Sequence, residues 1–145
     1  MSQDFLHRKA SFNYHIEGRY IAGLVLCGSE VKSLRSGKLS FNDSYCYFHD
    51  GELYVRNLHI PEYGLGHWSH HTPLQDRKLL LNRRELRKLE GKMKEKGISI
   101  IPLRVFFSDN GWAKMEIGWG KGKKHYDKRD TIKKRDVERE MKRLT

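Results

Sequence analysis

Alternation of apolar and polar residues over 101–107 and 113–119 constrains the fold of this chain more than any other feature. Successive side chains of a β-strand point to opposite faces, so this period predicts two half-buried strands. The intervening Ser-Asp-Asn-Gly at 108–111 is typical of a hairpin turn, so the two strands are predicted to pair antiparallel. The residues predicted to share one face are Ile101, Leu103, Val105 and Phe107 in the first strand and Ala113, Met115, Ile117 and Trp119 in the second.

Further strands are predicted towards the amino terminus. Residues 44–48 and 53–58 are rich in side chains that strands favour, and His-Asp-Gly-Glu at 49–52 joins them with an Asp-Gly turn. Residues 12–27 predict another strand, broken near Glu17-Gly18.

Two helices are predicted between the strands. Asn82 can cap a helix that ends at Gly97, because Glu85 stands three residues later in a capping-box position. Its apolar stripe consists of Leu86, Leu89 and Met93. A shorter helix over 29–36 is predicted to point Val31 and Leu34 inward and Glu30, Lys32 and Arg35 outward. Many short strands with two inserted helices predict a mainly β fold, a closed or nearly closed antiparallel barrel.

Charge divides the chain into a body and a tail. The 145 residues carry 29 Lys and Arg against 18 Asp and Glu, and residues 119–145 alone hold 11 basic and 5 acidic side chains. We therefore expect residues 1–120 to form one folded domain and 121–145 a basic tail, disordered when free because it has little apolar surface to bury. Val137, Met141 and Leu144 have the spacing of one helical stripe, so the tail is predicted to become helical on a partner.

Several classes of protein are disfavoured. No apolar run approaches the length of about 18 residues that a membrane span needs, and no secretory signal is evident, so we expect a soluble cytoplasmic protein. Cys27 and Cys46 are interpreted as small buried hydrophobic residues in a reducing compartment.

Candidate chemical motifs are weak. His67, His70 and His71 fall within five residues, but no cysteine pair or further ligand at metal-site spacing accompanies them. We therefore expect these histidines to lie in a solvated or RNA-facing loop. No nucleophile elbow, nucleotide-binding loop or carboxylate cluster is present, so we expect no catalysis, no metal and no cofactor. The alternating glycines at 118–122 allow two interpretations, either a close approach to a sugar-phosphate backbone or a flexible exit from the last strand.

Basic residues also gather inside the body. Arg77 and Lys78 are adjacent, and Arg84, Arg87 and Lys88 form one strip on the predicted helix after Asn82. Such a strip is either a solvated face or part of a nucleic-acid surface. With a barrel fold and a basic tail, the combination favours RNA or single-stranded nucleic acid.

Blocks of sequence in one order resemble the small protein B family of SsrA (tmRNA) binding proteins. The blocks are GSEVKSLRSGK at 28–38 with Asp-Ser-Tyr at 43–45, RKLLLN at 77–82, and GWGKGKKHYDKR at 118–129, continued by Ile132-Lys133 and Arg135. The resemblance implies an oligonucleotide-binding-type antiparallel β-barrel with flanking helices. It also implies a protein that binds the tRNA-like domain of tmRNA and helps deliver alanyl-tmRNA, with elongation factor Tu, to stalled ribosomes. The tail would lie in the empty mRNA channel near the decoding centre.

The resemblance also implies roles for individual residues. Leu80 and Asn82 match tmRNA-binding positions, Lys32 and Arg35 lie in the matching helix block, and Arg77 and Lys78 lie in the RKLLLN block. For Leu80 the alternative is core packing, and for Asn82 it is the helix cap. The tail positions expected to act on the ribosome are Lys121, Gly122, Lys123, Lys124, Tyr126, Asp127, Lys128 and Arg129, with Tyr126 as a residue that stacks on a base.

The chain departs from the family pattern at a few positions. Ile21 replaces a common Glu, Phe12 replaces a common His, and Trp119-Gly120 replaces an aliphatic residue followed by Ala. A general RNA chaperone or ribosome accessory factor is the alternative function, and a monomer is the expected state.

Overall fold

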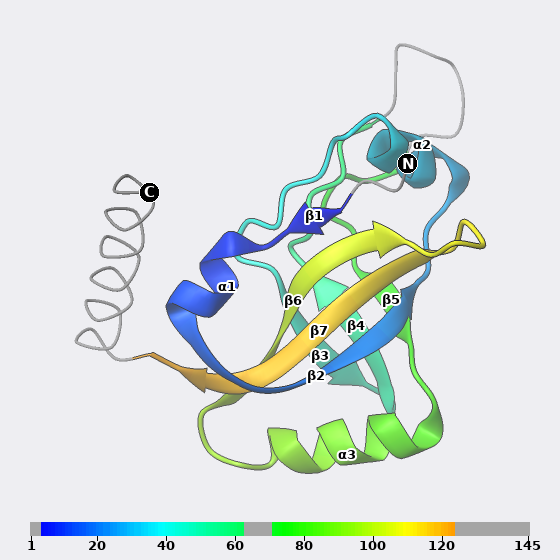
Figure 1. Ribbon diagram of the computed structural model, residues 1–145. Coiled ribbons are helices and arrows are strands. Elements are labelled where there is room, and N and C mark those ends of the chain that lie inside the picture. The colour runs from blue at the N-terminus through cyan, green and yellow to red at the C-terminus, as the bar shows by residue number, and fades with distance from the viewer. Residues whose placement is uncertain (1–3, 63–70, 124–145) are drawn as a thin grey trace, which may run out of the picture.

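The computed structural model describes residues 4–62 and 71–123 of the chain (Figure 1). Strands alternate with three helices along this part of the chain. The strands are β1 (Phe5–Leu6), β2 (Tyr14–Leu24), β3 (Tyr45–His49), β4 (Glu52–Arg56), β5 (Arg77–Leu80), β6 (Ile98–Phe107) and β7 (Ala113–Gly122), and the helices are α1 (Arg8–Asn13), α2 (Gly28–Arg35) and α3 (Arg83–Met93). The predicted tail beyond residue 123, with its helical stripe, lies outside the described residues.

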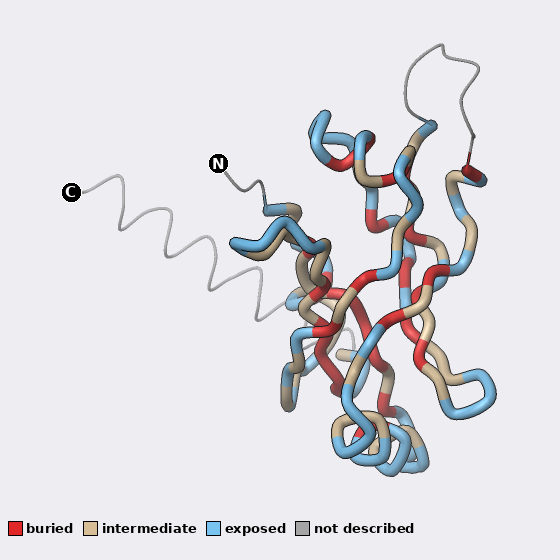
Figure 2. The backbone as a smooth tube through the Cα atoms, turned by 90° about the vertical axis from the view of Figure 1, so that its right-hand side faces the viewer, coloured by how far each residue is buried: buried red, intermediate tan, exposed pale blue. Residues whose placement is uncertain are grey.

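The strands form an antiparallel barrel, as predicted. Their order is β1-β6-β3-β4-β5-β2-β7, and a further pairing between β6 and β7 closes the sheet on itself. α3 lies across one end of the barrel, and Figure 2 shows buried backbone along the strands and exposed backbone at the turns. The core is made mainly of aliphatic side chains from the strands, joined by Leu34 of α2 and Leu89 of α3, which have no exposed surface.

The two predicted hairpins are confirmed. β6 pairs with β7, and β3 pairs with β4 across a two-residue turn in which Asp50 and Gly51 have φ angles of 51° and 77°. Positive φ at both turn residues matches the right-handed twist of the flanking strands, which is why Asp-Gly favours this turn.

A β-bulge divides β6 and corrects its predicted face. The register against β7 shifts between Pro102 and Arg104, because Pro102 has no N–H to donate to the ladder. Ile100 and Val105 both belong to the core, whereas Ile101 is buried outside that cluster. The prediction of one shared face is therefore wrong across the bulge, although it is right for Met115, Ile117 and Trp119 of β7.

The amino-terminal segment is more divided than predicted. Residues 12–13 end α1, and β2 begins only at Tyr14. The predicted break appears as a register shift between Ile16 and Gly18, after which β2 continues to Leu24. The short elements β1, α1 and β5 were not predicted, because none has enough residues for a clear period.

Both predicted helices are present. The Asn82 Oδ1 atom accepts a hydrogen bond from the Glu85 N–H at 2.8 Å, and the Glu85 carboxylate accepts one from the Asn82 N–H at 3.2 Å, so the capping box of α3 is confirmed. α3 ends at Met93, before the predicted Gly97. In α2 the prediction that Glu30 points outward is wrong, because Glu30 is 1% exposed.

Candidate nucleic-acid interface

An apolar hollow opens on the outer surface of the barrel, with a volume of about 490 Å³. Val25, Leu80 and Trp112 line it and are exposed by 45%, 54% and 70%. Large apolar side chains gathered on an open surface are unusual in a monomer and mark an interaction site. We call this hollow, with Gly23 and Lys114 in its lining, the Trp112 groove.

Three elements meet at the Trp112 groove. Gly23 of β2 pairs with Leu80 of β5 on one side and with Lys114 of β7 on the other. The Leu80 Cβ atom lies 3.3 Å from the point where a Cβ of Gly23 would stand, so a side chain at residue 23 would crowd Leu80. The absence of that side chain leaves room for Leu80 beside the backbone of β2.

The hairpin tip between β6 and β7 presents Trp112. The Ser108 N–H donates to the Trp112 carbonyl at 2.8 Å, and the Trp112 N–H donates to the Ser108 hydroxyl at 3.2 Å. Gly111 has a φ of 85°, which a side chain would disfavour. The turn therefore fixes the backbone of a Trp whose side chain is mostly exposed.

Cationic side chains lie around the apolar surface. Lys114 lines the Trp112 groove, and a Cβ at Gly111 would stand 3.9 Å from the Arg35 guanidinium. That guanidinium also lies over the Phe107 ring, 4.8 Å from its centroid. Lys32 and Arg35 are both exposed on α2, as predicted. The groove thus combines a flat aromatic surface with nearby positive charge.

The predicted residues Leu80, Asn82 and Lys78 belong to the same part of the molecule. Leu80 is exposed, so the alternative that it packs in the core is excluded. Asn82 is also exposed, and its amide oxygen caps α3. The Lys78 ammonium lies 3.8 Å from the Glu52 carboxylate, and both side chains are partly exposed.

Arg77 does not share this surface. Its residue is 2% exposed, and its guanidinium forms an ion pair with Glu30 and donates to the carbonyls of Leu58 at 2.5 Å and Pro73 at 3.0 Å. The prediction that Arg77 contacts RNA is at odds with this interior position, because its donors already hold the chain together. We therefore leave Arg77 out of the candidate interface.

The pKa of Glu30 reflects the same network. Burial alone would raise it, but the hydrogen bond from the Cys27 N–H and the charge of Arg77 outweigh burial and hold the pKa below its ordinary value. Glu30 thus remains a carboxylate in the interior and joins α2 to β5.

Two further expectations are corrected here. His71 is 5% exposed, with its ring nitrogens 2.8 Å from the Ser29 hydroxyl and 2.7 Å from the Ile60 carbonyl, so it joins the interior rather than an RNA-facing loop. Cys46 is buried as predicted, but Cys27 is exposed.

Nothing in the described part of the chain gathers as a metal site. Over residues 4–62 and 71–123, no three His, Cys, Asp or Glu side chains come together in a way that could hold an ion. His67 and His70 lie outside these ranges.

The glycines of β7 have different roles. Gly118 and Gly120 are buried, and a Cβ on Gly120 would stand 1.8 Å from the His15 carbonyl oxygen. These two glycines therefore allow close packing with β2, whereas Gly122 has open space around it. Lys121 and Gly122, predicted to begin the tail, are the last residues of β7.

The tail leaves the barrel far from the Trp112 groove. Tyr14 pairs with Gly122 at one end of the β2–β7 ladder, and Gly23 pairs with Lys114 at the other. Nine residues of strand at about 3.3 Å each separate these ends by about 30 Å. The Lys123 N–H, just beyond the ladder, donates to the Asn13 carbonyl at 2.7 Å. Of the predicted tail residues, Lys124, Tyr126, Asp127, Lys128 and Arg129 lie outside the described residues.

Trp112, Val25 and Lys114 were not predicted as site residues. Trp112 follows a turn glycine, and an aromatic residue at a hairpin tip is a signal that could have been used. Nothing in the local sequence marks Val25 or Lys114 as a site residue. Only the pairing of β2 with β5 and β7 brings the segments that contain them to the same groove.

The arrangement is suited to stacking and phosphate contact. An exposed indole can stack on an unpaired base of any sequence, and Lys and Arg side chains neutralise the adjoining phosphates. No acid–base pair or nucleophile is needed for such a surface. None of the helices in the described ranges is long and apolar enough to cross a membrane.

Comparisons with known proteins all point to one family. The sequence model of the SmpB protein family matches residues 5–145. A protein of Salinispora arenicola named SsrA-binding protein is 53% identical over 137 residues, which cover 94% of this chain and 86% of that protein. One of the same name from Bacteroides thetaiotaomicron is 46% identical over 143 residues, covering 99% and 95%.

A solved structure is similar as well. It is described as "tmRNA-SmpB: a journey to the center of the bacterial ribosome" and superposes with a TM-score of 0.72 at 44% identity, covering 84% of this chain and 85% of that chain.

Proposed function

The chain belongs to the SmpB protein family, and we propose on that premise that it binds tmRNA and acts in trans-translation. The barrel binds the tRNA-like domain of tmRNA and helps deliver alanyl-tmRNA, together with elongation factor Tu, to stalled ribosomes. The tail occupies the empty mRNA channel near the decoding centre. The protein works as a monomer in the cytoplasm and has no catalytic role.

The Trp112 groove carries this proposal. Its three exposed apolar side chains, Val25, Leu80 and Trp112, offer stacking and packing surface for an unpaired base or a tRNA-like elbow. Lys114 lines the groove and Arg35 lies beside it, so both can meet the adjoining phosphates, and Lys32 is exposed on the same helix as Arg35. Such a surface fits a folded RNA better than a uniform duplex, because stacking needs bases that are not already covered.

The separation of the groove from the tail exit supports a division between two RNAs. The groove and residue 122 lie at opposite ends of the β2–β7 ladder, about 30 Å apart. One molecule can therefore hold tmRNA at one end and direct its basic tail to ribosomal RNA from the other. Residues 119–145 hold 11 basic and 5 acidic side chains, which suits a tail that lies among phosphates.

A tail that folds only when it binds its partner can also distinguish an empty mRNA channel from one that holds a message. Folding on binding costs conformational entropy at the moment of binding, so the tail gains stability only where the channel is empty. An intact message that fills the channel should weaken tail binding. Equal tail binding with and without message would contradict this part of the proposal.

The first experiment measures binding of the purified full chain to the tRNA-like domain of tmRNA and to a hairpin of equal length. Near-physiological salt weakens non-specific phosphate contacts and so isolates shape recognition. A strong preference for the tRNA-like domain is the expected result. Equal binding to both RNAs would favour a general RNA chaperone or ribosome accessory factor instead.

Paired variants then test the groove. Trp112→Ala and Leu80→Ala should each weaken binding of the tRNA-like domain, Trp112→Ala by about 5- to 150-fold, the usual effect of losing one stacked base. Leu6→Ala and Leu74→Ala are matched controls, because these leucines are similarly exposed at 59% and 48% but do not line the groove. If Leu80→Ala weakens binding of the tRNA-like domain no more than the control variants do, the groove is not part of the RNA interface.

A further inference from the structure

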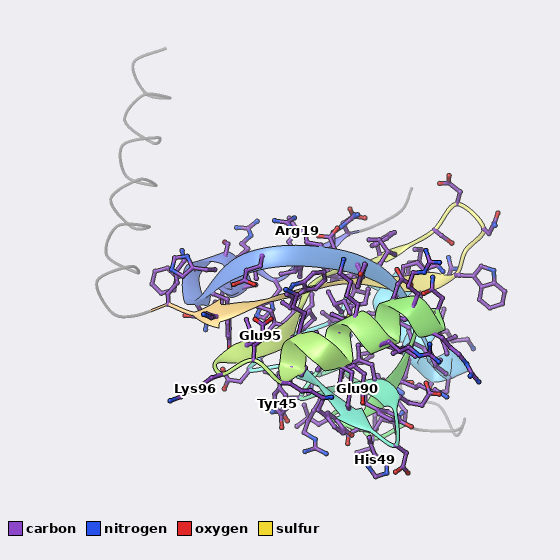
Figure 3. All side chains as sticks on the ribbon, turned by 90° about the horizontal axis from the view of Figure 1, so that it is seen from below. Arg19, Tyr45, His49, Glu90, Glu95 and Lys96 are labelled. Atoms are coloured by element: carbon purple, nitrogen blue, oxygen red, sulfur yellow. The ribbon has the colours of Figure 1, made fainter. Side chains whose placement is uncertain are left out.

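A second hollow lies beside the point where the tail leaves the barrel. It has a volume of about 310 Å³ and is bounded by the end of α1, the start of β3 and the start of β6. Its lining includes three tyrosines and several polar residues, namely Tyr14, Tyr45, Tyr47, Asn13, Asn42 and Asp43. In Figure 3, which shows the molecule from below, Tyr45 lies on the opposite side of α3 from Arg19. We call this hollow the Tyr45 pocket.

Ser44, in the lining of the Tyr45 pocket, has a buried hydroxyl group that needs an explanation. It lines the pocket and is 4% exposed, and its hydroxyl has no hydrogen-bond partner among the residues that the structure describes. A buried hydroxyl without a partner costs folding free energy, so such a group calls for an explanation. The hydroxyl oxygen is itself buried, so a ligand in the pocket would provide a partner only after the Ser44 side chain turns towards the pocket.

The tyrosine rings are held in place from outside the pocket. The Tyr47 hydroxyl donates to the Asp76 carboxylate at 2.7 Å, and the Arg56 guanidinium lies over the Tyr47 ring, 4.3 Å from its centroid. Tyr54 stacks on Tyr47 at 5.7 Å, whereas Tyr45 lies 6.5 Å from Tyr47 and is 37% exposed. Tyr47 thus forms a supported wall, and Tyr45 is the ring that solvent reaches.

We propose that the Tyr45 pocket binds a single unstacked base of the RNA that the tail contacts on the ribosome. This inference rests on the proposed function, because it takes ribosomal RNA as the tail's partner. Aromatic rings supply a stacking surface for any base, and the Asn side chains supply donors and acceptors for a base edge. The Ser44 hydroxyl adds a further donor and acceptor once its side chain turns towards the bound base. Lys9 lies in the same lining and can meet the phosphate of that nucleotide.

The location favours RNA over a small molecule or a peptide. Asn13 lines the pocket and also accepts the hydrogen bond from the Lys123 N–H, so the pocket adjoins the first residue beyond β7. RNA that contacts the chain near Lys123 would therefore lie beside this opening. The volume is at the lower end of the range of about 300–1,000 Å³ for small-ligand pockets, which suits one base.

The test measures binding of the full chain to ribosomes that carry no message, and binding to the tRNA-like domain in parallel. Tyr45→Ala should weaken ribosome binding by about 5- to 150-fold and leave binding of the tRNA-like domain unchanged. Tyr45→Phe keeps the ring and should bind ribosomes like the wild type. Trp112→Ala, at the other end of the β2–β7 ladder, should show the reverse pattern. If Tyr45→Ala binds ribosomes as strongly as the wild type, the proposal that the Tyr45 pocket binds a base is wrong.

Ser44→Ala separates a ligand contact from a structural role. Because the hydroxyl has no protein partner among the described residues, its removal should leave the melting temperature unchanged or raise it. Ribosome binding should nevertheless weaken several-fold. A lower melting temperature with unchanged ribosome binding would assign Ser44 to the fold. A failure of the proposed function gives a different result. The wild type and every variant would then bind the tRNA-like domain no better than a hairpin of equal length.

Discussion

The first and last residues of one short strand have opposite roles in this protein. In β5, Arg77 points into the interior and pairs with Glu30, whereas Leu80 stands exposed at the Trp112 groove. The alternation of side chains along a strand decides this difference, and it changes with a register shift of one residue. Residue type alone predicts the reverse, since Arg is usually exposed and Leu usually buried.

The Glu30–Arg77 pair makes the stability of the fold depend on pH in the acidic range. Because the folded pKa of Glu30 lies below its ordinary value of 4.5, the carboxylate stabilises the fold fully above about pH 4.5, and this contribution is lost as the pH falls through the folded pKa. Glu30→Gln should lower the free energy of unfolding at pH 7 by about 3 kcal/mol, since it leaves Arg77 without its counter-ion. Urea unfolding from pH 3 to pH 7 measures the effect.

The pH dependence distinguishes this ion pair from simple packing. The difference between wild type and Glu30→Gln should shrink below pH 4.5, where the wild-type carboxyl also becomes neutral. Glu52→Gln is the matched control, because Glu52 lies 3.8 Å from Lys78 with 43% of its side chain exposed and should change stability by less than about 0.5 kcal/mol. A difference that stays constant across the pH range would contradict the role of the Glu30 charge.

At the scale of elements, the residue that caps α3, Asn82, is also one that the family resemblance connects with RNA. Asn82→Ala should reduce stability by about 1 kcal/mol through loss of the cap and should also weaken binding of the tRNA-like domain. Asn82→Ser retains a good cap and removes only the amide. If Asn82 contacts RNA, Asn82→Ser should therefore bind weakly while its melting temperature stays near that of the wild type.

Full binding by Asn82→Ser would assign Asn82 to capping alone. The strip of Arg84, Arg87 and Lys88 on the same helix is exposed and stands next to this cap, so it can extend the RNA surface beyond the groove.

Elements with strong local signals were predicted well, and weak ones were not. The Asp-Gly turn at 50–51 and the capping box at Asn82 depend on chemistry within a few residues, and both are confirmed. β5 has only 4 residues and pairs with β4 and β2, so its sequence neighbours say little about it. The bulge at Pro102 likewise becomes visible only against β7.

At the scale of the whole molecule, the two ends of the β2–β7 ladder should act independently. Replacing Asp127, Lys128 and Arg129 together by Ala should leave the melting temperature and binding of the tRNA-like domain nearly unchanged but abolish tagging of stalled products. Tagging in a reconstituted translation reaction measures the effect. Trp112→Ala is the reciprocal control, because it should weaken binding of the tRNA-like domain itself. A large loss of tmRNA affinity in the tail variant would refute this division.

The sequence by itself determined the mainly β class, the two hairpins and the two larger helices, and its charge distribution predicts a division into a moderately basic body and a strongly basic tail. Each depends on interactions within a few residues or on composition, which any reader of the chain can evaluate. Tertiary structure alone decided that Arg77 is buried and that Val25, Leu80 and Trp112 form one groove. These residues are far apart in the chain, and only the register of β2 against β5 and β7 brings them together.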